Sequence, residues 1–385
     1  MSYLTFKKMK MLFASTAEVL AYFLAPLKKT QSTEKQLLIV RLDAIGDYIL
    51  FRNFLVYIKQ SEKYKSHKIT IVGNNAWKNI AEAFDNQVVD NWIWVQVPKV
   101  YFDFDYRFKI LQFIYAHTFD TAVMPMHTRL FMIDKIFKYL KCKKIAHISA
   151  LDTNYNLTKL NLANEWFDQI VDTGKETIFE FERNKLFFEK WLEIKIPINK
   201  PELNTNEIDS NIVLSKFNII NTKYIVVFPG GSSMEKRWKP KFFSNVINYI
   251  SDIYEYKILL IGAPNEIEIS KEILSICKSE SIIDLVGKTT LVDLVYLIKN
   301  ANLLIANESS GVHVAVATET PAVCISYSSF YGRFTPYPPS IPHKIKYVFH
   351  PKIESKDDSF TNYNHLSIND INPTTINHLL SEMLN

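Results

Sequence analysis

Three short segments of the 385-residue chain combine glycines, hydroxyl groups and charged side chains in patterns that suit proton transfer or anion binding. The first runs from Arg41 to Asp47, directly after an apolar stretch. Because the chain has only nine glycines, Gly46 points to a tight strand-to-helix turn. A carboxylate at the start of the following helix stays charged at neutral pH, since unpaired amides and the helix dipole stabilise it. Asp47 is therefore a candidate general base, with a simple helix cap as the alternative.

The second segment runs from Phe228 to Trp238 and contains a pair of glycines followed by Ser232, Ser233 and Lys236. Glycines and hydroxyls after a strand let a loop approach an anion closely, and a lysine adds a point charge suited to a diphosphate. The alternative is a surface loop with solvated basic side chains. We predict that Ser232, Ser233 and Lys236 bind phosphate.

The third segment also joins a predicted strand to a predicted helix, and it contains Glu308, Ser309, Ser310, Gly311 and His313. The amides of Ser309 to Gly311 would lie at a helix N-terminus, which binds anions without a charged side chain. Glu308 could accept hydrogen bonds from loop amides or from a ribose. Helix capping by Glu308 or Ser309, with a half-buried His313, is the alternative.

Two further sites carry weaker signals. His127 and Arg129 follow an apolar strand, and Arg129 would suit a phosphate or carboxylate of an acceptor. Asp103-Phe104-Asp105 has the spacing of a metal-diphosphate motif, but it precedes a predicted helix, so capping explains it. We expect no metal site.

Strand and helix patterns alternate along the chain and place the three segments at strand-to-helix turns. Apolar β-branched runs predict strands at 37–42, 68–72, 88–95, 121–124 and 144–148, separated by helices at 47–60, 76–84, 106–116 and 131–140. The pattern restarts at Tyr224, with strands at 224–228, 257–261, 281–286, 302–305 and 322–326 and helices at 242–253, 266–277, 291–300 and 310–318. Such alternation is typical of a parallel sheet with helices on both faces.

This pattern predicts an α/β protein with two Rossmann-like, doubly wound parallel-sheet lobes. Ligands of such sheets bind beyond the carboxyl ends of the strands, so we expect the lobes to face a cleft. The polar stretch 152–211, with one helix at 180–192, is interpreted as the linker region. We place an N-terminal segment at 1–34, the lobes at 35–200 and 201–370, and a C-terminal helix at 371–385.

The composition is that of a soluble globular protein, with 48% hydrophobic and 22% charged residues. The net charge of +5 is too small to indicate nucleic acid as a partner. Cys142, Cys277 and Cys324 lack metal-ligand spacing and are odd in number, which favours a reducing compartment. We therefore expect a cytoplasmic protein without cofactor.

The apolar segment at 11–27 lies between clusters of lysines and is interrupted by Glu18 and Pro26. It is too short and too polar to span a bilayer comfortably. Two alternatives remain open, an amphipathic helix on the cytoplasmic face of an anionic membrane and a helix packed on the protein's own surface. Glu18 within the apolar stretch disfavours a signal peptide.

The order and spacing of these motifs resemble those of the heptosyltransferases, glycosyltransferase family nine, over about residues 37–326. The resemblance is carried by Leu38–Leu42 with Ile45-Gly46-Asp47, Pro229-Gly230 with Lys236-Arg237-Trp238, Gly287–Leu291, and Asn307–Ser310 with His313. It implies a GT-B fold, inverting transfer without metal, Asp47 as general base, and donor contacts from Lys236 and from the amides of Ser309 to Gly311. Glu308 stands where that family commonly has aspartate, and this difference bears on the identity of the donor.

The resemblance implies an inverting glycosyltransferase that moves a sugar, expected to be heptose, from a nucleoside diphosphate to a lipopolysaccharide-core or other cell-envelope glycan. A nucleotide-sugar-binding scaffold without turnover is the alternative, and the presence of both Asp47 and Lys236 argues against it. A two-Rossmann oxidoreductase would need a glycine-rich dinucleotide turn that neither lobe contains.

Overall fold

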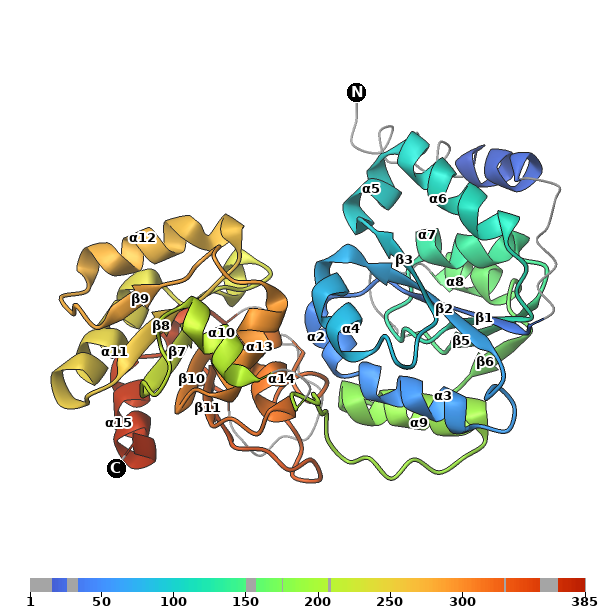
Figure 1. Cartoon of the computed structure of the whole chain (residues 1–385). Coiled ribbons are helices and arrows are strands. Elements are labelled where there is room, and N and C mark those ends of the chain that lie inside the picture. The colour runs from blue at the N-terminus through green and yellow to red at the C-terminus, as the bar shows by residue number, and fades with distance from the viewer. Residues whose placement is uncertain are drawn as a thin grey trace. The chain divides into compact units, whose positions relative to one another are not determined.

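The structure is a computed structural model that describes residues 16–25, 34–149, 157–174, 176–206, 209–328, 330–353 and 366–384. The chain divides into two compact units (Figure 1). Unit 1 consists of Met1–Tyr48, Phe54–Glu176 and Glu182–Ile196, and unit 2 consists of Ile49–Asn53, Thr177–Phe181 and Pro197–Asn385. Each unit contains one six-stranded parallel sheet, so the predicted doubly wound α/β architecture is confirmed.

The sheet of unit 1 has the strand order β3-β2-β1-β4-β5-β6. Its strands are β1 (Gln36–Arg41), β2 (Lys68–Asn74), β3 (Asn91–Val95), β4 (Thr121–Met124), β5 (Lys143–His147) and β6 (Gln169–Val171). β1 is buried at every position after its first residue, because a central parallel strand is covered on both faces. All strands run in one direction, so the loops that follow β1 and β4 lie at the same edge of the sheet.

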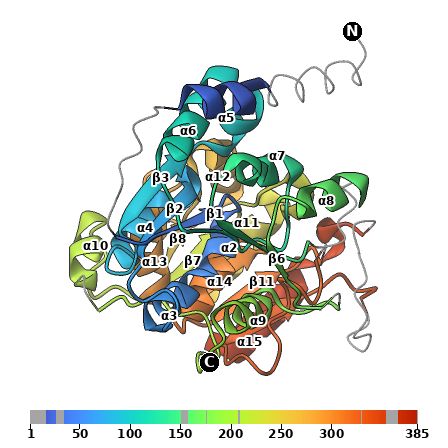
Figure 2. The ribbon, with the colours of Figure 1, turned by 90° about the vertical axis from the view of Figure 1, so that its right-hand side faces the viewer.

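Helices cover both faces of this sheet (Figures 1 and 2). On one face, α5 (Val97–Phe102), α6 (Phe104–Ala116), α7 (Phe131–Asp134) and the 3-10 helix η3 (Lys135–Tyr139) share an apolar core with β1 and β4. On the other lie α3 (Leu55–Gln60) and α9 (Glu180–Leu192), where the rings of Phe54 and Phe188 stack at 5.4 Å. Unit 1 also contains the 3-10 turn η2 (Asn75–Trp77) and the helices α4 (Lys78–Phe84) and α8 (Leu157–Asn164).

The continuous helix predicted over 47–60 is wrong. The structure has α2 (Ile45–Ile49), a 3-10 turn η1 (Arg52–Phe54) and then α3. At the break, the side chains of Arg52 and Asn53 donate hydrogen bonds to the carbonyl of Glu202, at 2.5 and 2.9 Å. Since Glu202 lies 150 residues from Arg52 in the sequence, helical periodicity alone could not reveal the interruption.

Residues 16–24 form a helix that packs on unit 1 beside α6, as both ribbon views show. Ala17 and Ala21 are fully buried, and Glu18 is 2% exposed. For these residues, packing on the protein's own surface is therefore observed, and the remainder of the predicted 11–27 segment lies outside the described residues. No helix among the residues described is both long and apolar enough to cross a bilayer.

The sheet of unit 2 has the order β12-β11-β10-β7-β8-β9. Its strands are β7 (Tyr224–Phe228), β8 (Lys257–Leu260), β9 (Ile282–Asp284), β10 (Leu303–Asn307), β11 (Ala322–Ile325) and β12 (Ile345–Val348). The central strands β7 and β10 are buried at every position and pair in parallel from Leu303 opposite Ile225. The turns that follow these two strands therefore lie next to each other.

One face of this sheet shares a core with α11 (Pro240–Ile253), α12 (Ile267–Ile276) and α15 (Pro373–Leu384). The helix α13 (Leu291–Lys299) packs against α10 (Ser210–Lys216) and also against α14 (Ser310–Ala317). Short 3-10 turns occur at η4 (Met234–Lys236), η5 (Pro264–Glu266) and η6 (Ile368–Asp370). The C-terminal helix predicted after Asn372-Pro373 is confirmed.

The stretch 152–211 is not a plain linker, since it contains α8, β6 and α9 and the start of α10. β6 pairs with β5 and forms the edge of the first sheet. Its three residues, Gln169–Val171, are too few to give a strand pattern in the sequence.

Candidate active site

In unit 1, Asp47 lies in the first turn of the five-residue helix α2, at the carboxyl edge of the sheet. Arg41, the last residue of β1, is fully buried and donates a hydrogen bond from Nη2 to the main-chain oxygen of Asp47 at 3.1 Å. The same guanidinium pairs with the carboxylate of Asp43 at 2.7 Å. Arg41 therefore ties the turn that carries Asp47 to the end of the central strand.

Residues near the ends of the neighbouring strands β2 and β4 also contact this turn. The side chains of Asn74 and Trp77 both donate to the carbonyl of Asp43, at 2.9 and 3.2 Å. The amide of Leu42 contacts the sulfur of Met126 at 3.2 Å, which connects the loop after β1 to the loop after β4. The turn that leads to Asp47 is thus held by residues of β1 and β2, by Trp77 of η2 and by the loop after β4.

His127 lies at this same edge of the sheet, whereas the side chain of Arg129 is buried inside unit 1. The Nδ1 atom of His127 lies 2.8 Å from the carbonyl of Ile148, so this nitrogen donates. Arg129 is 2% exposed and donates to both carboxylate oxygens of Asp134 and to Asn164. These contacts hold the Arg129 guanidinium inside unit 1.

In unit 2, the glycine loop after β7 is shaped by a buried carboxylate. Glu266 accepts hydrogen bonds from the amides of Gly231 at 3.0 Å and Ala263 at 2.8 Å. A β-carbon at position 230 would lie 2.2 Å from the Glu266 carboxylate, so glycine is required there. The sequence analysis did not single out Glu266, because it lies 35 residues from its partner in the loop.

Asn307, the last residue of β10, joins the two neighbouring turns. Its buried side-chain amide donates to the carbonyl oxygens of Pro229 and Gly230, at 2.6 and 3.2 Å. Its side-chain oxygen accepts from the amide of Trp238 at 3.3 Å. A single residue therefore sets both ends of the loop that carries Ser232, Ser233 and Lys236.

Lys236 and Glu308 come together from these adjacent turns. The ammonium of Lys236 lies 3.6 Å from one carboxylate oxygen of Glu308 and 5.4 Å from the ring centre of Phe330. The other carboxylate oxygen of Glu308 accepts from the hydroxyl of Ser326 and the amide of Ser328, at 2.8 and 3.0 Å. Glu308 therefore holds Lys236 in place and anchors the loop after β11.

The helix α14 begins directly after this carboxylate. Ser309 occupies the N-cap position, but its hydroxyl makes no capping hydrogen bond and is buried without a partner among the described residues. The helix lies close to β7 at Gly311, because a β-carbon at this position would be only 2.7 Å from the ring of Phe228. The first amides of α14 can thus donate hydrogen bonds to a negatively charged group.

His313 lies on α14, and its Nδ1 atom is 2.9 Å from the hydroxyl of Tyr337. Burial, and secondarily the charge of Lys236, lowers the pKa of His313 to about 4. His313 is therefore neutral at physiological pH, and Lys236 carries the positive charge of this group.

The structure thus brings Lys236, Glu308, Ser309 and His313 together in unit 2, with Ser310 and Gly311 in the first turn of α14. Ser233 forms the N-cap of η4, and Ser232 beside it is exposed. In unit 1, Asp47 and His127 share the carboxyl edge of the sheet.

Asp103 caps α6 by accepting from the amide of Tyr106 at 3.0 Å, which confirms the capping interpretation. Among the described residues, no group of His, Cys, Asp and Glu side chains is arranged to hold a metal ion.

The chain is similar in sequence to known glycosyltransferases. Residues 171–362 match the sequence model of glycosyltransferase family 9 (heptosyltransferase). Lipopolysaccharide heptosyltransferase 2 of Salmonella typhimurium is 27% identical over 199 residues, which cover 49% of this chain and 55% of the relative. The chain spans about half the length of the curated relatives that it matches.

Solved structures match over a larger part of the chain. A glycosyltransferase family 9 protein from Veillonella parvula has a TM-score of 0.71 and 17% identity, with coverage of 93% of this chain and 99% of that one. The ADP-heptose lipopolysaccharide heptosyltransferase II of Escherichia coli has a TM-score of 0.66 and 18% identity, with coverage of 91% and 98%. Together with the two parallel sheets, these structures define the GT-B fold class.

The match to the family model starts at the last residue of β6 and includes β7 to β12, with the turns that carry Lys236 and Glu308. The chain belongs to glycosyltransferase family 9, the heptosyltransferase family.

Proposed function

We propose that the protein is an inverting glycosyltransferase that transfers heptose from ADP-heptose to a lipopolysaccharide-core or other cell-envelope glycan. The observation that carries the proposal is the group in unit 2, where Lys236 and the start of α14 come from neighbouring strand ends. A lysine beside a helix N-terminus suits the two phosphates of a nucleotide sugar. Similar proteins are lipopolysaccharide heptosyltransferases, one of them the ADP-heptose enzyme of Escherichia coli, and they suggest the sugar and the acceptor class.

In the proposed reaction, an acceptor hydroxyl attacks the anomeric carbon while the bond from that carbon to the diphosphate oxygen breaks. Asp47 takes the proton of the hydroxyl as the new bond forms. Lys236 and the amides of Ser309 to Gly311 stabilise the negative charge that develops on the departing diphosphate. The pairing of Lys236 with Glu308 keeps the ammonium close to α14, where it can bind this charge.

Arg41 acts in this proposal as a positioning residue. Its hydrogen bond to the main-chain oxygen of Asp47 and its ion pair with Asp43 orient the turn without contacting a substrate. His127, at the same edge, is the proposed acceptor contact of unit 1.

The proposed transfer needs no divalent metal ion. The charge of the leaving diphosphate is balanced by Lys236 and helix amides, and the acidic pair Asp103 and Asp105 serves the start of α6. Neutral His313 adds a donor or acceptor to the group but no charge.

We further propose a cytoplasmic protein that contacts the inner membrane surface peripherally. A glycan acceptor under assembly on a lipid is presented at that surface. The 16–24 helix on the outside of unit 1 supports such a contact, because several of its apolar side chains face outward.

The test is to incubate purified protein with ADP-heptose and a truncated lipopolysaccharide acceptor, and to follow glycan mass and ADP release. Turnover should fall by about 10²–10⁴ in Asp47→Asn, since the amide keeps the size of the side chain but cannot take a proton. Donor binding and melting temperature should stay near the parent values. Donor binding without turnover in the parent protein would favour the scaffold alternative, and normal turnover of Asp47→Asn would remove Asp47 from the mechanism.

A further inference from the structure

The 16–24 helix is fastened to unit 1 by its single acidic residue. Glu18 is 2% exposed and its carboxylate lies 2.5 Å from the guanidinium of Arg107 on α6. Its second oxygen lies 3.5 Å from the ammonium of Lys135 on η3. The negative charge of the helix is therefore turned inward and paired, and no other acidic side chain is present between residues 16 and 24.

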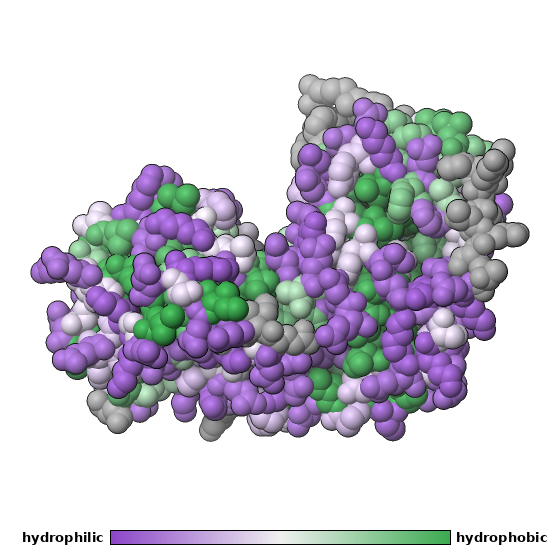
Figure 3. Space-filling view, viewed as in Figure 1, coloured by the Kyte–Doolittle hydropathy of each residue, from purple (hydrophilic) through white to green (hydrophobic). Residues whose placement is uncertain are grey.

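The opposite face of this helix is apolar and exposed. Phe23 is 72% exposed, Leu24 59%, Leu20 40% and Val19 37%. Hydrophobic colouring gathers at this end of unit 1 in Figure 3. Phe113 of α6, which is 50% exposed, follows Gln112, whose side chain donates to the carbonyl of Leu24. The apolar surface thus continues from the helix onto the unit itself.

Two lysines border this apolar face through aromatic rings. Lys141 lies over the ring of Tyr22 at 5.3 Å, and Lys138 lies over the ring of Tyr139 at 5.3 Å. The two tyrosine rings stack with centres 5.2 Å apart. Both lysines are exposed, and neither forms an ion pair with an acidic side chain in the described part of the chain. The border of the apolar face is therefore positively charged.

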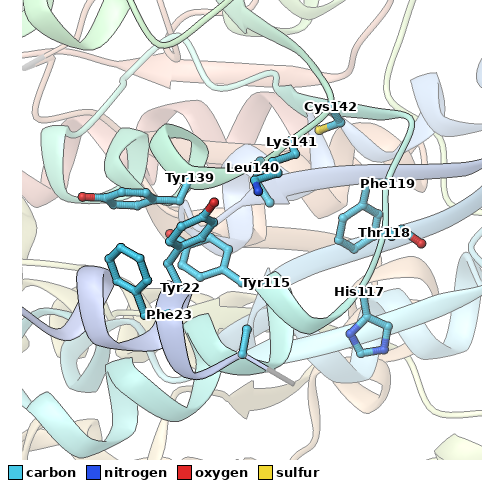
Figure 4. A pocket seen from close by; sticks show the side chains of 11 residues that line it. Tyr22, Phe23, Tyr115, His117, Thr118, Phe119, Tyr139, Leu140, Lys141 and Cys142 are labelled. Atoms are coloured by element: carbon cyan, nitrogen blue, oxygen red, sulfur yellow. The ribbon is translucent and has the colours of Figure 1, made fainter. Parts of the chain in front are cut away.

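A cavity of about 270 Å³ opens between the helix and unit 1 (Figure 4). Four aromatic side chains and one lysine contribute to its lining, namely Tyr22, Phe23, Tyr115, Tyr139 and Lys141. Residues 117–119 and 140–142 line it as well, and they precede β4 and β5. The cavity therefore lies at the amino edge of the sheet, whereas Asp47 and His127 lie at the carboxyl edge.

We propose that this face binds the surface of an anionic lipid bilayer. Apolar side chains of residues 19–24 enter the acyl region, while tyrosine rings and lysines lie at the level of the head groups, where such residues are favoured. Lys138 and Lys141 bind lipid phosphates, and the aromatic cavity accommodates part of one lipid. The proposal rests on the proposed use of a membrane-presented acceptor and assigns the residues that make the contact.

The layered chemistry favours a bilayer over a protein partner. The exposed apolar side chains of the helix lie next to stacked tyrosine rings, and lysines lie over those rings. The one acidic side chain of the helix, which would repel anionic lipid, is buried against Arg107. A bilayer also leaves the carboxyl edge of the sheet open, because the lipid-binding side chains lie at the amino edge.

The experiment is co-sedimentation of the full chain with vesicles of phosphatidylcholine, alone or mixed with phosphatidylglycerol. Phe23→Ser with Leu24→Ser, and separately Lys138→Gln with Lys141→Gln, should each reduce binding to the mixed vesicles on the order of tenfold. The lysine effect should shrink at high salt. Lys241→Gln and Ile253→Ser are matched controls on unit 2, where Lys241 also lies over a ring and Ile253 is 56% exposed.

Equal binding to neutral and mixed vesicles, absence of binding, or paired variants that match their controls would overturn the proposal and leave the face for a protein partner. Melting temperatures of the variants exclude loss of folding as the cause. Transfer to a soluble acceptor, measured in parallel, separates the two proposals. Vesicle binding without transfer contradicts the proposed transfer reaction only, and transfer without vesicle binding contradicts the proposed membrane contact only.

Discussion

At the scale of single residues, Lys236 should determine the affinity for the donor. Lys236→Ala removes a charge-assisted contact to phosphate that is typically worth about 1.5–3 kcal/mol. The dissociation constant for ADP should therefore rise by roughly 10- to 100-fold in calorimetry. Lys241→Ala, which removes an exposed lysine of α11, is the control and should bind ADP as the parent does. Equal affinity of both variants would show that Lys236 only pairs with Glu308 and does not bind the donor.

His313 should make stability depend on pH. Its pKa is lowered from 6.5 to about 4 in the folded state by burial and by Lys236, so protonation favours the unfolded state. Its contribution to stability is therefore complete above the unfolded pKa, near 6.5, and is lost as the pH falls from there toward about 4. Urea unfolding of His313→Gln should show a weaker loss of stability between about pH 7 and about pH 5 than the parent.

The matched control is His378→Gln on α15, where the side chain is 81% exposed. This substitution should leave the pH dependence of unfolding unchanged. A parent-like slope in His313→Gln would mean that the other buried histidines, such as His147, carry the effect.

At the scale of elements, the 16–24 helix should stabilise unit 1 through Glu18. Glu18→Gln leaves Arg107 and Lys135 buried beside a neutral group, and loss of one partner from a buried ion pair costs roughly 3–5 kcal/mol. We expect a clear decrease in the urea midpoint. Glu62→Gln is the control, because its pair with Lys65 is exposed and should contribute little. Deletion of residues 1–30 should destabilise unit 1 at least as much, and an unchanged midpoint would contradict the structural role of this ion pair.

The sequence predicts those helices and strands whose residues form a clear local pattern. The central strands β1, β7 and β10 are continuous apolar runs, and α9 and α15 have helical spacing with clear ends. The break between α2 and α3 depends on hydrogen bonds to Glu202, and β6 is too short to give a pattern. Elements that depend on distant partners could therefore not be predicted.

The same distinction holds for the candidate site. Lys236, Glu308 and His313 can be proposed from the sequence because they lie in turns with recognisable residue types. Asn307 and Glu266 were missed as determinants of the loop, since their partners lie 78 and 35 residues away. A buried carboxylate at the start of a helix, as in Glu266, looks like an ordinary surface residue in the sequence.

At the scale of the whole molecule, the proposed chemistry predicts activity without divalent metal. Treatment with a chelator should leave the transfer rate unchanged, because Lys236 and helix amides balance the diphosphate charge. The measurement is initial rate of ADP release before and after chelation, and again after addition of magnesium or manganese. Loss of activity on chelation and its recovery with metal would contradict this mechanism.

The contact between position 230 and Glu266 also constrains how the protein can evolve. A β-carbon at position 230 would lie 2.2 Å from that carboxylate, so Gly230→Ala is accessible only after residue 266 has become smaller. The reverse order starts from a strained loop and would be removed by selection. Homologous chains with a side chain at position 230 should therefore lack the acid at position 266, and the two positions should vary together across the family.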